Sequence, residues 1–144
     1  MKDLEKRFRR VIGGMQGNEA LVPSLGDAAA GELFSWGEAT AKHIVDETDG
    51  MEDAAAEEHM APRLRALRVM MRAVGRWVGE AKTLDLDARQ ALWNRAGEQA
   101  RVLFGDSFEL PSMEMALAQL PPDADAVRVI AWLKDFIEEK SSRG

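Results

Sequence analysis

The densest run of carboxylates in the chain lies between its only two histidines, in the stretch HIVDETDGMEDAAAEEH from His43 to His59. Carboxylate and imidazole groups are the ligands left for a metal ion, because the chain contains no cysteine. On a helix, side chains three or four residues apart project from the same face, as those of His43, Asp46 and Glu47 would. These three residues are the candidate metal ligands, whereas His59 has no acidic residue at either spacing.

The segment from Asp46 to Glu58, which we call the acidic belt, fits neither of two known kinds of metal site. An EF-hand loop needs glycine at position 6 and glutamate at position 12, and with Gly50 at position 6 the twelfth residue is Ala56. All-α hydrolases that hold Mg²⁺ typically present carboxylates in E-x-x-E pairs, and this chain has none. A metal-dependent phosphohydrolase that uses the belt is therefore an alternative that rests on composition alone.

A second charged group follows the belt, in the segment PRLRALRVMMRAVGRWVGEAK. Its arginine stripe, defined as Arg65, Arg68, Arg72 and Arg76, shares one face of a predicted helix whose opposite face is apolar. Guanidinium groups stay charged and bind carboxylates or phosphates through paired hydrogen bonds. The stripe is either a solvated face with local ion pairs or a binding surface with one of three destinations: the acidic belt of the same molecule, an acidic partner protein, or a nucleic-acid backbone.

The charge blocks of the chain bear on that choice. Residues 18–61 hold one base and eleven acids, and residues 62–82 hold six bases and one acid, within a net charge of −6. Basic groups beside so many carboxylates compete poorly for a polyanion, and no aromatic residue interleaves the stripe for base stacking. An acidic protein surface is therefore favoured over nucleic acid. A basic cluster near the N-terminus could extend the same surface; it contains Lys6, Arg7, Arg9 and Arg10.

Helical periodicity predicts the elements that position these residues, and no segment has the alternating pattern of a strand. We expect an all-α fold, a single-domain bundle of five to six helices over residues 1–144, with Trp36, Trp77 and Trp93 in its core. The first expected element is a helix over Lys2–Ile12 that ends at Gly13 and Gly14. A second helix is expected to be capped by Ser24 and to end before Gly50. Further along, Pro62 is expected to cause a break near Ala61, with a helix on each side of it. The later ones are a helix from Asp85 to a stop at Gly105, a short helical turn after Pro111, and a last helix capped by Asp123.

The missing motifs and the charge pattern together limit the classes of function that the chain can have. No uncharged apolar run approaches the ~20 residues that span a bilayer, and the charged N-terminus is unlike a signal peptide, so we expect a cytoplasmic protein that binds no membrane. We also expect no cofactor, unless the belt holds a divalent cation. The leading hypothesis is a non-enzymatic protein-interaction module, a small subunit or adaptor that binds a protein partner or itself as a homo-oligomer. The alternatives are a nucleic-acid-binding small subunit that uses the arginine stripe and the phosphohydrolase that uses the acidic belt.

Overall fold

The computed structural model describes residues 2–16, 25–121 and 123–143, and in these ranges the chain forms six α-helices and no strand. The all-α bundle expected from the sequence is therefore confirmed. The helices are α1 (Lys2–Gln16), α2 (Asp27–Asp46), α3 (Asp53–Gly79), α4 (Leu86–Phe104), α5 (Met113–Gln119) and α6 (Ala126–Arg143).

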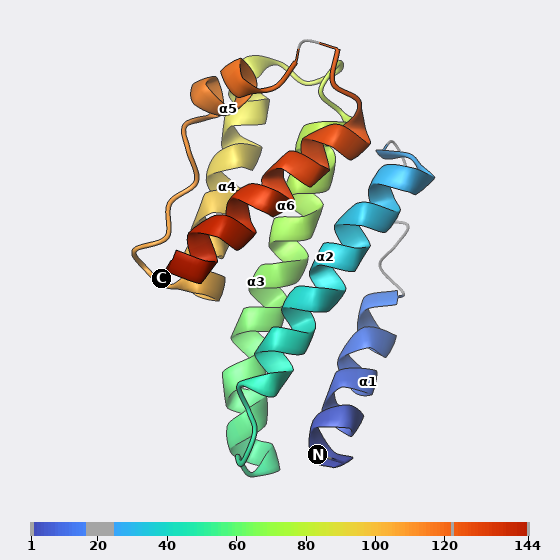
Figure 1. Cartoon of the computed structure of the whole chain (residues 1–144), viewed down its shortest axis with the longest axis vertical. Helices are drawn as coiled ribbons and strands as arrows, with labels where there is room; N and C mark the ends of the chain where they lie inside the picture. Colours follow the sequence, from blue (N-terminus) through green and yellow to red (C-terminus); the bar gives the residue numbers. More distant parts are fainter. Residues whose placement is uncertain (1, 17–24, 122, 144) are drawn as a thin grey trace.

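Helix α3 occupies the middle of the arrangement. In Figure 1, α4, α3, α2 and α1 follow one another from left to right, and α6 crosses diagonally in front of α3. Helices α2, α3 and α4 run down, up and down the long axis, while the short α5 lies at the upper end beside the start of α4. The contacts of α3 with α2, α4 and α6 make it the element around which the other helices pack.

Several helix ends follow directly from local sequence. The Asp85 side chain accepts a hydrogen bond from Ala88 N at 2.7 Å at the start of α4, and Gly105, with φ at +106°, follows its last residue. The hydroxyl of Ser112 caps α5 in the same way, accepting from Met115 N at 3.1 Å. The predicted boundaries of α4 and the predicted helical turn after Pro111 are confirmed.

Two predicted helix boundaries are wrong and one lies outside the described residues. Helix α1 continues through Gly13 to Gln16, because glycine lowers helix stability by only ~1 kcal/mol and does not by itself end a helix. Asp125, rather than Asp123, accepts from Arg128 N at 2.9 Å at the start of α6. The expected cap Ser24 falls outside the described ranges.

The predicted break near Ala61 is also wrong, because α3 runs unbroken through Pro62. Proline lacks an N–H group, so the carbonyl four residues earlier loses its main-chain donor. The side chain of Pro62 is exposed, and the core residues Met60 and Leu67 pack on either side of it along the same helix. Burial of both halves of α3 against the same core outweighs the local cost of the proline.

The hydrophobic core joins α2, α3, α4 and α6 around three tryptophans. Trp36, Trp77 and Trp93 are all buried, as expected from their places on apolar faces. The rings of Trp77 and Trp93 lie 4.8 Å apart, which fixes α4 against α3. The indole N–H groups of this pair both have a partner. Trp77 Nε1 donates to Met113 Sδ at 3.3 Å, and Trp93 Nε1 donates to the Pro111 carbonyl at 2.8 Å. These bonds tie α5 and the segment before it to the α3–α4 pair.

Candidate interaction surface on helix α3

The arginine stripe lies on the side of α3 that no other helix covers. Arg65, Arg68 and Arg72 have exposed side chains. Within residues 2–16, 25–121 and 123–143, none of the three forms an ion pair or a side-chain hydrogen bond. The opposite face of the same helix carries Leu67 and Trp77, which are almost completely buried. The core thus holds the helix in place and leaves the three guanidinium groups open to solvent.

Arg76 differs from the rest of the stripe. Its side chain is half-buried, and its Nε donates to Glu80 Oε2 at 2.7 Å one turn further along the helix. This pair occupies the guanidinium with an intrahelical partner. The accessible part of the stripe is therefore Arg65, Arg68 and Arg72, which we call the open arginines.

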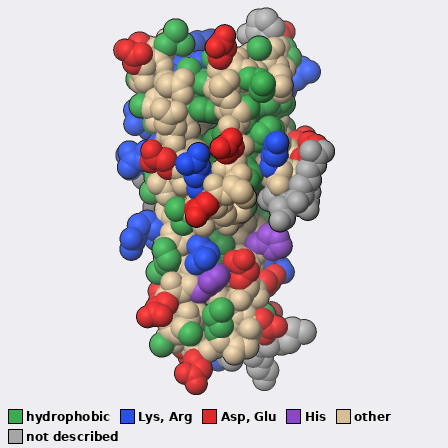
Figure 2. Space-filling model, turned by 90° about the vertical axis from the view of Figure 1, so that its left-hand side faces the viewer, with side chains coloured by type: hydrophobic (Ala, Val, Ile, Leu, Met, Phe, Trp, Pro, Cys, Tyr) green, Lys and Arg blue, Asp and Glu red, His purple; other side chains and the backbone are tan. Residues whose placement is uncertain are grey.

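The acidic belt surrounds the turn between α2 and α3, at the lower end of the molecule. All seven of its carboxylates are exposed. Two of them form ion pairs with residues outside the stripe, Asp46 with Lys42 (3.1 Å) and Asp53 with Arg7 (3.0 Å), and Glu47 is hydrogen-bonded to His59 (3.1 Å). In Figure 2, acidic side chains occur along the whole height of the face, and the two histidines lie in its lower half among acidic and basic side chains. Belt and stripe therefore do not neutralise each other within the described part of one molecule.

The candidate metal ligands are not brought together. His43 is exposed, and Asp46 is engaged by Lys42. The turn at Gly50 folds the start of α3 back beside the end of α2 and brings His59 Nε2 close to Glu47 Oε1. His59 therefore has an acidic neighbour on another helix, which the residue spacing along its own helix could not reveal. Across the described residues, no group of three or more His, Asp or Glu side chains is placed to hold a metal ion.

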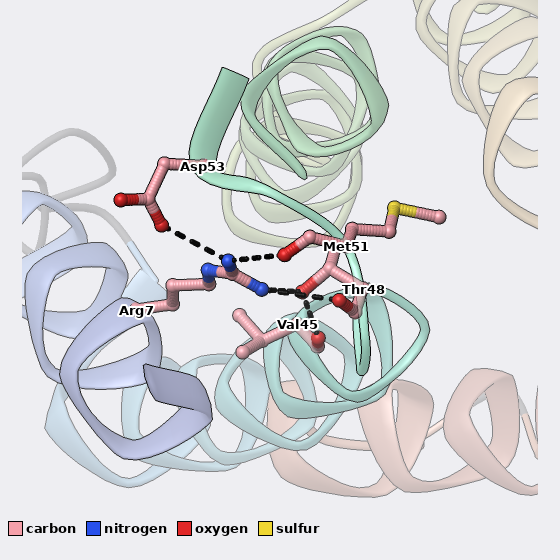
Figure 3. A network of polar contacts seen from close by, with 5 residues as sticks. All are labelled: Arg7, Val45, Thr48, Met51 and Asp53. Atoms are coloured by element: carbon pink, nitrogen blue, oxygen red, sulfur yellow. Dashed lines mark hydrogen bonds and ion pairs between the residues drawn. The ribbon is translucent and has the colours of Figure 1, made fainter. Parts of the chain in front are cut away.

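A buried arginine holds the same turn together, as Figure 3 shows. Only 6% of Arg7 is exposed. Its Nη1 donates to the carbonyl and the hydroxyl of Thr48 (3.1 and 3.0 Å), and its Nη2 donates to the Met51 carbonyl (2.8 Å) and to Asp53 Oδ1 (3.0 Å). The Thr48 hydroxyl in turn donates to the Val45 carbonyl at 2.6 Å. One side chain thus links α1 to the end of α2 and the start of α3.

The expectation that Arg7 belongs to an exposed basic cluster is therefore wrong. The signal that identifies it lies in the spacing of α1, where Arg7 is three residues after Leu4 and four before Val11, on the face that packs against the core. Lys6, Arg9 and Arg10 are exposed, and α2 separates their helix from most of α3 in Figure 1. The cluster does not continue the arginine stripe.

A second charged residue is held near the core at the junction of α3 and α4. The guanidinium of Arg89 stacks on the Trp77 ring at 4.5 Å, and its Nη2 donates to the Trp77 carbonyl at 3.4 Å. Burial lowers the pKa of Arg89, and its Nε has no hydrogen-bond partner among the described residues. The stack packs the start of α4 against α3 and supplies no catalytic pair.

An open groove of about 560 Å³ lies between α4 and the segment that precedes α5. Its lining is mixed: the Trp93 ring lies at its base, and Gln90 and Asn94 hydrogen-bond to each other at 2.8 Å on its wall. The Ser112 hydroxyl, also in the lining, is engaged in capping α5, and the lining contains no histidine to activate a nucleophile.

Comparison of the chain with protein-family models, with curated proteins and with solved structures found no match. None of the helices in the described ranges is both long enough and apolar enough to cross a membrane.

Proposed function

We propose that the protein is a non-enzymatic interaction module that binds an acidic protein surface through the open arginines of α3. The observation that carries this proposal is that Arg65, Arg68 and Arg72 have no acidic partner among the described residues, although the belt carries seven carboxylates. Guanidinium groups on a helix fixed by its buried face are held ready for carboxylates with little further loss of backbone freedom.

The size of the basic surface favours a protein over a nucleic acid. Arg65 to Arg72 spans roughly 10 Å of helix at 1.5 Å per residue, and the acidic residue Glu58 lies about 10 Å before Arg65 on the same helix. A short acidic helix or loop of a partner protein is small enough to contact the open arginines without reaching the acidic residues of α3. A long duplex would place its further phosphates against the belt, where repulsion offsets the gain from counterion release.

The proposal is tested by measuring the fluorescence anisotropy of labelled probes with the wild type and with Arg65→Gln/Arg68→Gln/Arg72→Gln. The probes are a short poly-glutamate peptide, a DNA duplex and a single-stranded RNA. We expect the wild type to bind the peptide with an affinity that falls as salt rises, and we expect the triple variant to lose this binding. A matched variant, Lys6→Gln/Arg10→Gln, removes exposed charges from α1 and should bind like the wild type.

Two results would contradict the proposal. One is tighter binding of DNA or RNA than of the peptide, abolished by the triple change, which would identify a nucleic-acid surface. The other is peptide binding that the triple variant retains, which would place the acidic-surface site elsewhere on the molecule.

A further inference from the structure

The exposed face of α3 extends well beyond the open arginines. Its exposed residues run from Ala54 to Arg72, roughly 28 Å of helix, and they are Ala54, Glu57, Glu58, Pro62, Arg65, Arg68 and Arg72. At ~100° per residue they fall on one side of the helix. The first half of this face is acidic and the second half is basic, so the face carries two opposite charges in sequence along one rigid element.

The helix macrodipole does not explain this order, because Glu57 and Glu58 lie beyond the first turn of α3, where the acidic residue is Asp53. Carboxylates are favoured in the first turn of a helix and cations in its last turn, and the effect falls off beyond that turn. Arg65, Arg68 and Arg72 lie in the middle of α3, which continues to Gly79. In the last turn the basic residue is Arg76, which pairs with Glu80. The three open arginines can therefore bind negative charge from a source outside the helix.

We propose that this source is a second copy of the chain, bound through α3 in antiparallel orientation. A twofold axis that crosses the exposed face between Pro62 and Arg65 places Glu58 of each copy opposite Arg68 of the other and brings Glu57 close to the same arginine. The arrangement matches the acidic half of each α3 with the basic half of its mate. This inference rests on the proposed function, since it names the acidic surface that the open arginines bind.

Charge complementarity favours a second copy over other occupants. The face carries two carboxylates and three arginines, so an antiparallel dimer pairs Glu57 and Glu58 of each copy with arginines of the other in a closed twofold assembly. Ala54 and Ala61 lack long side chains that would keep two helices apart. The face has no large exposed hydrophobic residue, since those of the described chain are Met51, Leu86, Val102 and Met115. The dimer is therefore weak, reversible and sensitive to salt.

Sedimentation equilibrium of the full chain over a range of protein concentrations tests the inference. At low salt the average mass of the wild type should rise toward twice that of one chain as concentration increases. At ~1 M salt, where the screening length is ~3 Å, it should return to the mass of the monomer. Circular dichroism of each variant confirms that it is folded.

Charge reversal tests the orientation. Arg68→Glu/Arg72→Glu makes the face almost wholly acidic, and Glu57→Arg/Glu58→Arg makes it wholly basic, so each variant alone should remain a monomer. Mixed in equal amounts, the two variants should form a mixed dimer, because every pair is again of opposite sign. The control Arg9→Glu/Arg10→Glu reverses exposed charges on α1 and should dimerise like the wild type.

Three outcomes would overturn the inference. They are a wild type that stays monomeric at every concentration at low salt, reversed variants that dimerise alone, and a dimeric wild type whose two reversed variants fail to combine. The proposed function is judged separately. If poly-glutamate binding still depends on the open arginines while the wild type is monomeric, the acidic surface belongs to a different protein.

Discussion

Arg7 and the open arginines are the same residue type placed near the same acidic segment, and the fold treats them in opposite ways. Arg7 is buried and donates to four acceptors around the α2–α3 turn. Arg65, Arg68 and Arg72 are exposed and have no acidic partner among the described residues. Proximity in sequence to carboxylates therefore does not decide where an arginine binds.

Main-chain carbonyls account for the difference. Thr48 and Met51 lie in the turn after α2, and this turn directs their carbonyls toward α1. A buried guanidinium loses its hydration, and only a full set of acceptors offsets that loss. The turn supplies such a set to Arg7, whereas in the described residues no main-chain carbonyl accepts a hydrogen bond from the open arginines.

Replacing Arg7 should have the largest effect on stability. Arg7→Met keeps an unbranched apolar stem but removes the donor to the Met51 carbonyl and both Arg7 hydrogen bonds to Thr48, whose carbonyl keeps only the Met51 N–H. We expect a loss of about 2–4 kcal/mol in the free energy of unfolding, measured by urea denaturation. Arg9→Met is the control, because Arg9 is exposed and its pair with Glu5 at 3.6 Å contributes at most ~1 kcal/mol. Equal effects of the two changes would contradict a structural role for Arg7.

Replacing Gly50 tests how strongly stability depends on the conformation of the α2–α3 turn that Arg7 binds. Its φ of +82° lies in the left-handed region, and a Cβ built there meets no atom within 4 Å. Gly50→Ala should therefore cost only the backbone strain, about 1–2 kcal/mol by thermal or urea denaturation. Gly13→Ala, in the helical backbone of α1 with equal space for a Cβ, should instead be neutral or stabilising by up to ~1 kcal/mol. A Gly50→Ala protein as stable as the wild type would show that the turn has another accessible conformation.

Asp53 tests whether charge or the carbonyl acceptors hold Arg7. Its side chain is 98% exposed although it lies 3.0 Å from Arg7 Nη2. Water screens an ion pair with one exposed member, so Asp53→Asn should leave the urea midpoint close to that of the wild type and far above that of Arg7→Met. A loss of stability matching that of Arg7→Met would show that the ion pair, rather than the carbonyls, fixes the turn.

The sequence predicts those parts of the fold that local chemistry controls. Asp85 and Gly105 bound α4 as expected, and the three tryptophans on apolar faces are buried. The continuity of α3 through Pro62 depends on core packing at Met60 and Leu67, which no local pattern reveals.

For the candidate site, as for the fold, the sequence predicts the features that depend on local spacing. Helical spacing places the open arginines on one exposed face, but the partner of each charge depends on how the helices pack. The closure of the turn at Gly50 brings His59 to Glu47 and Arg7 to Asp53, across separations of 12 and 46 residues. Periodicity reports which face a side chain lies on, and long-range pairs form only once the turn has brought separate helices together.

The urea unfolding free energy of Arg65→Gln/Arg68→Gln/Arg72→Gln, compared with those of the wild type and Arg7→Met, tests the central claim most directly. If the open arginines serve a surface outside the molecule, the triple change should alter stability by less than ~1 kcal/mol, because glutamine keeps helix propensity and no internal ion pair is lost. The same protein should lose its salt-sensitive binding of acidic peptide. A destabilisation as large as that of Arg7→Met would contradict the account, because it would show that the three arginines dock within their own chain.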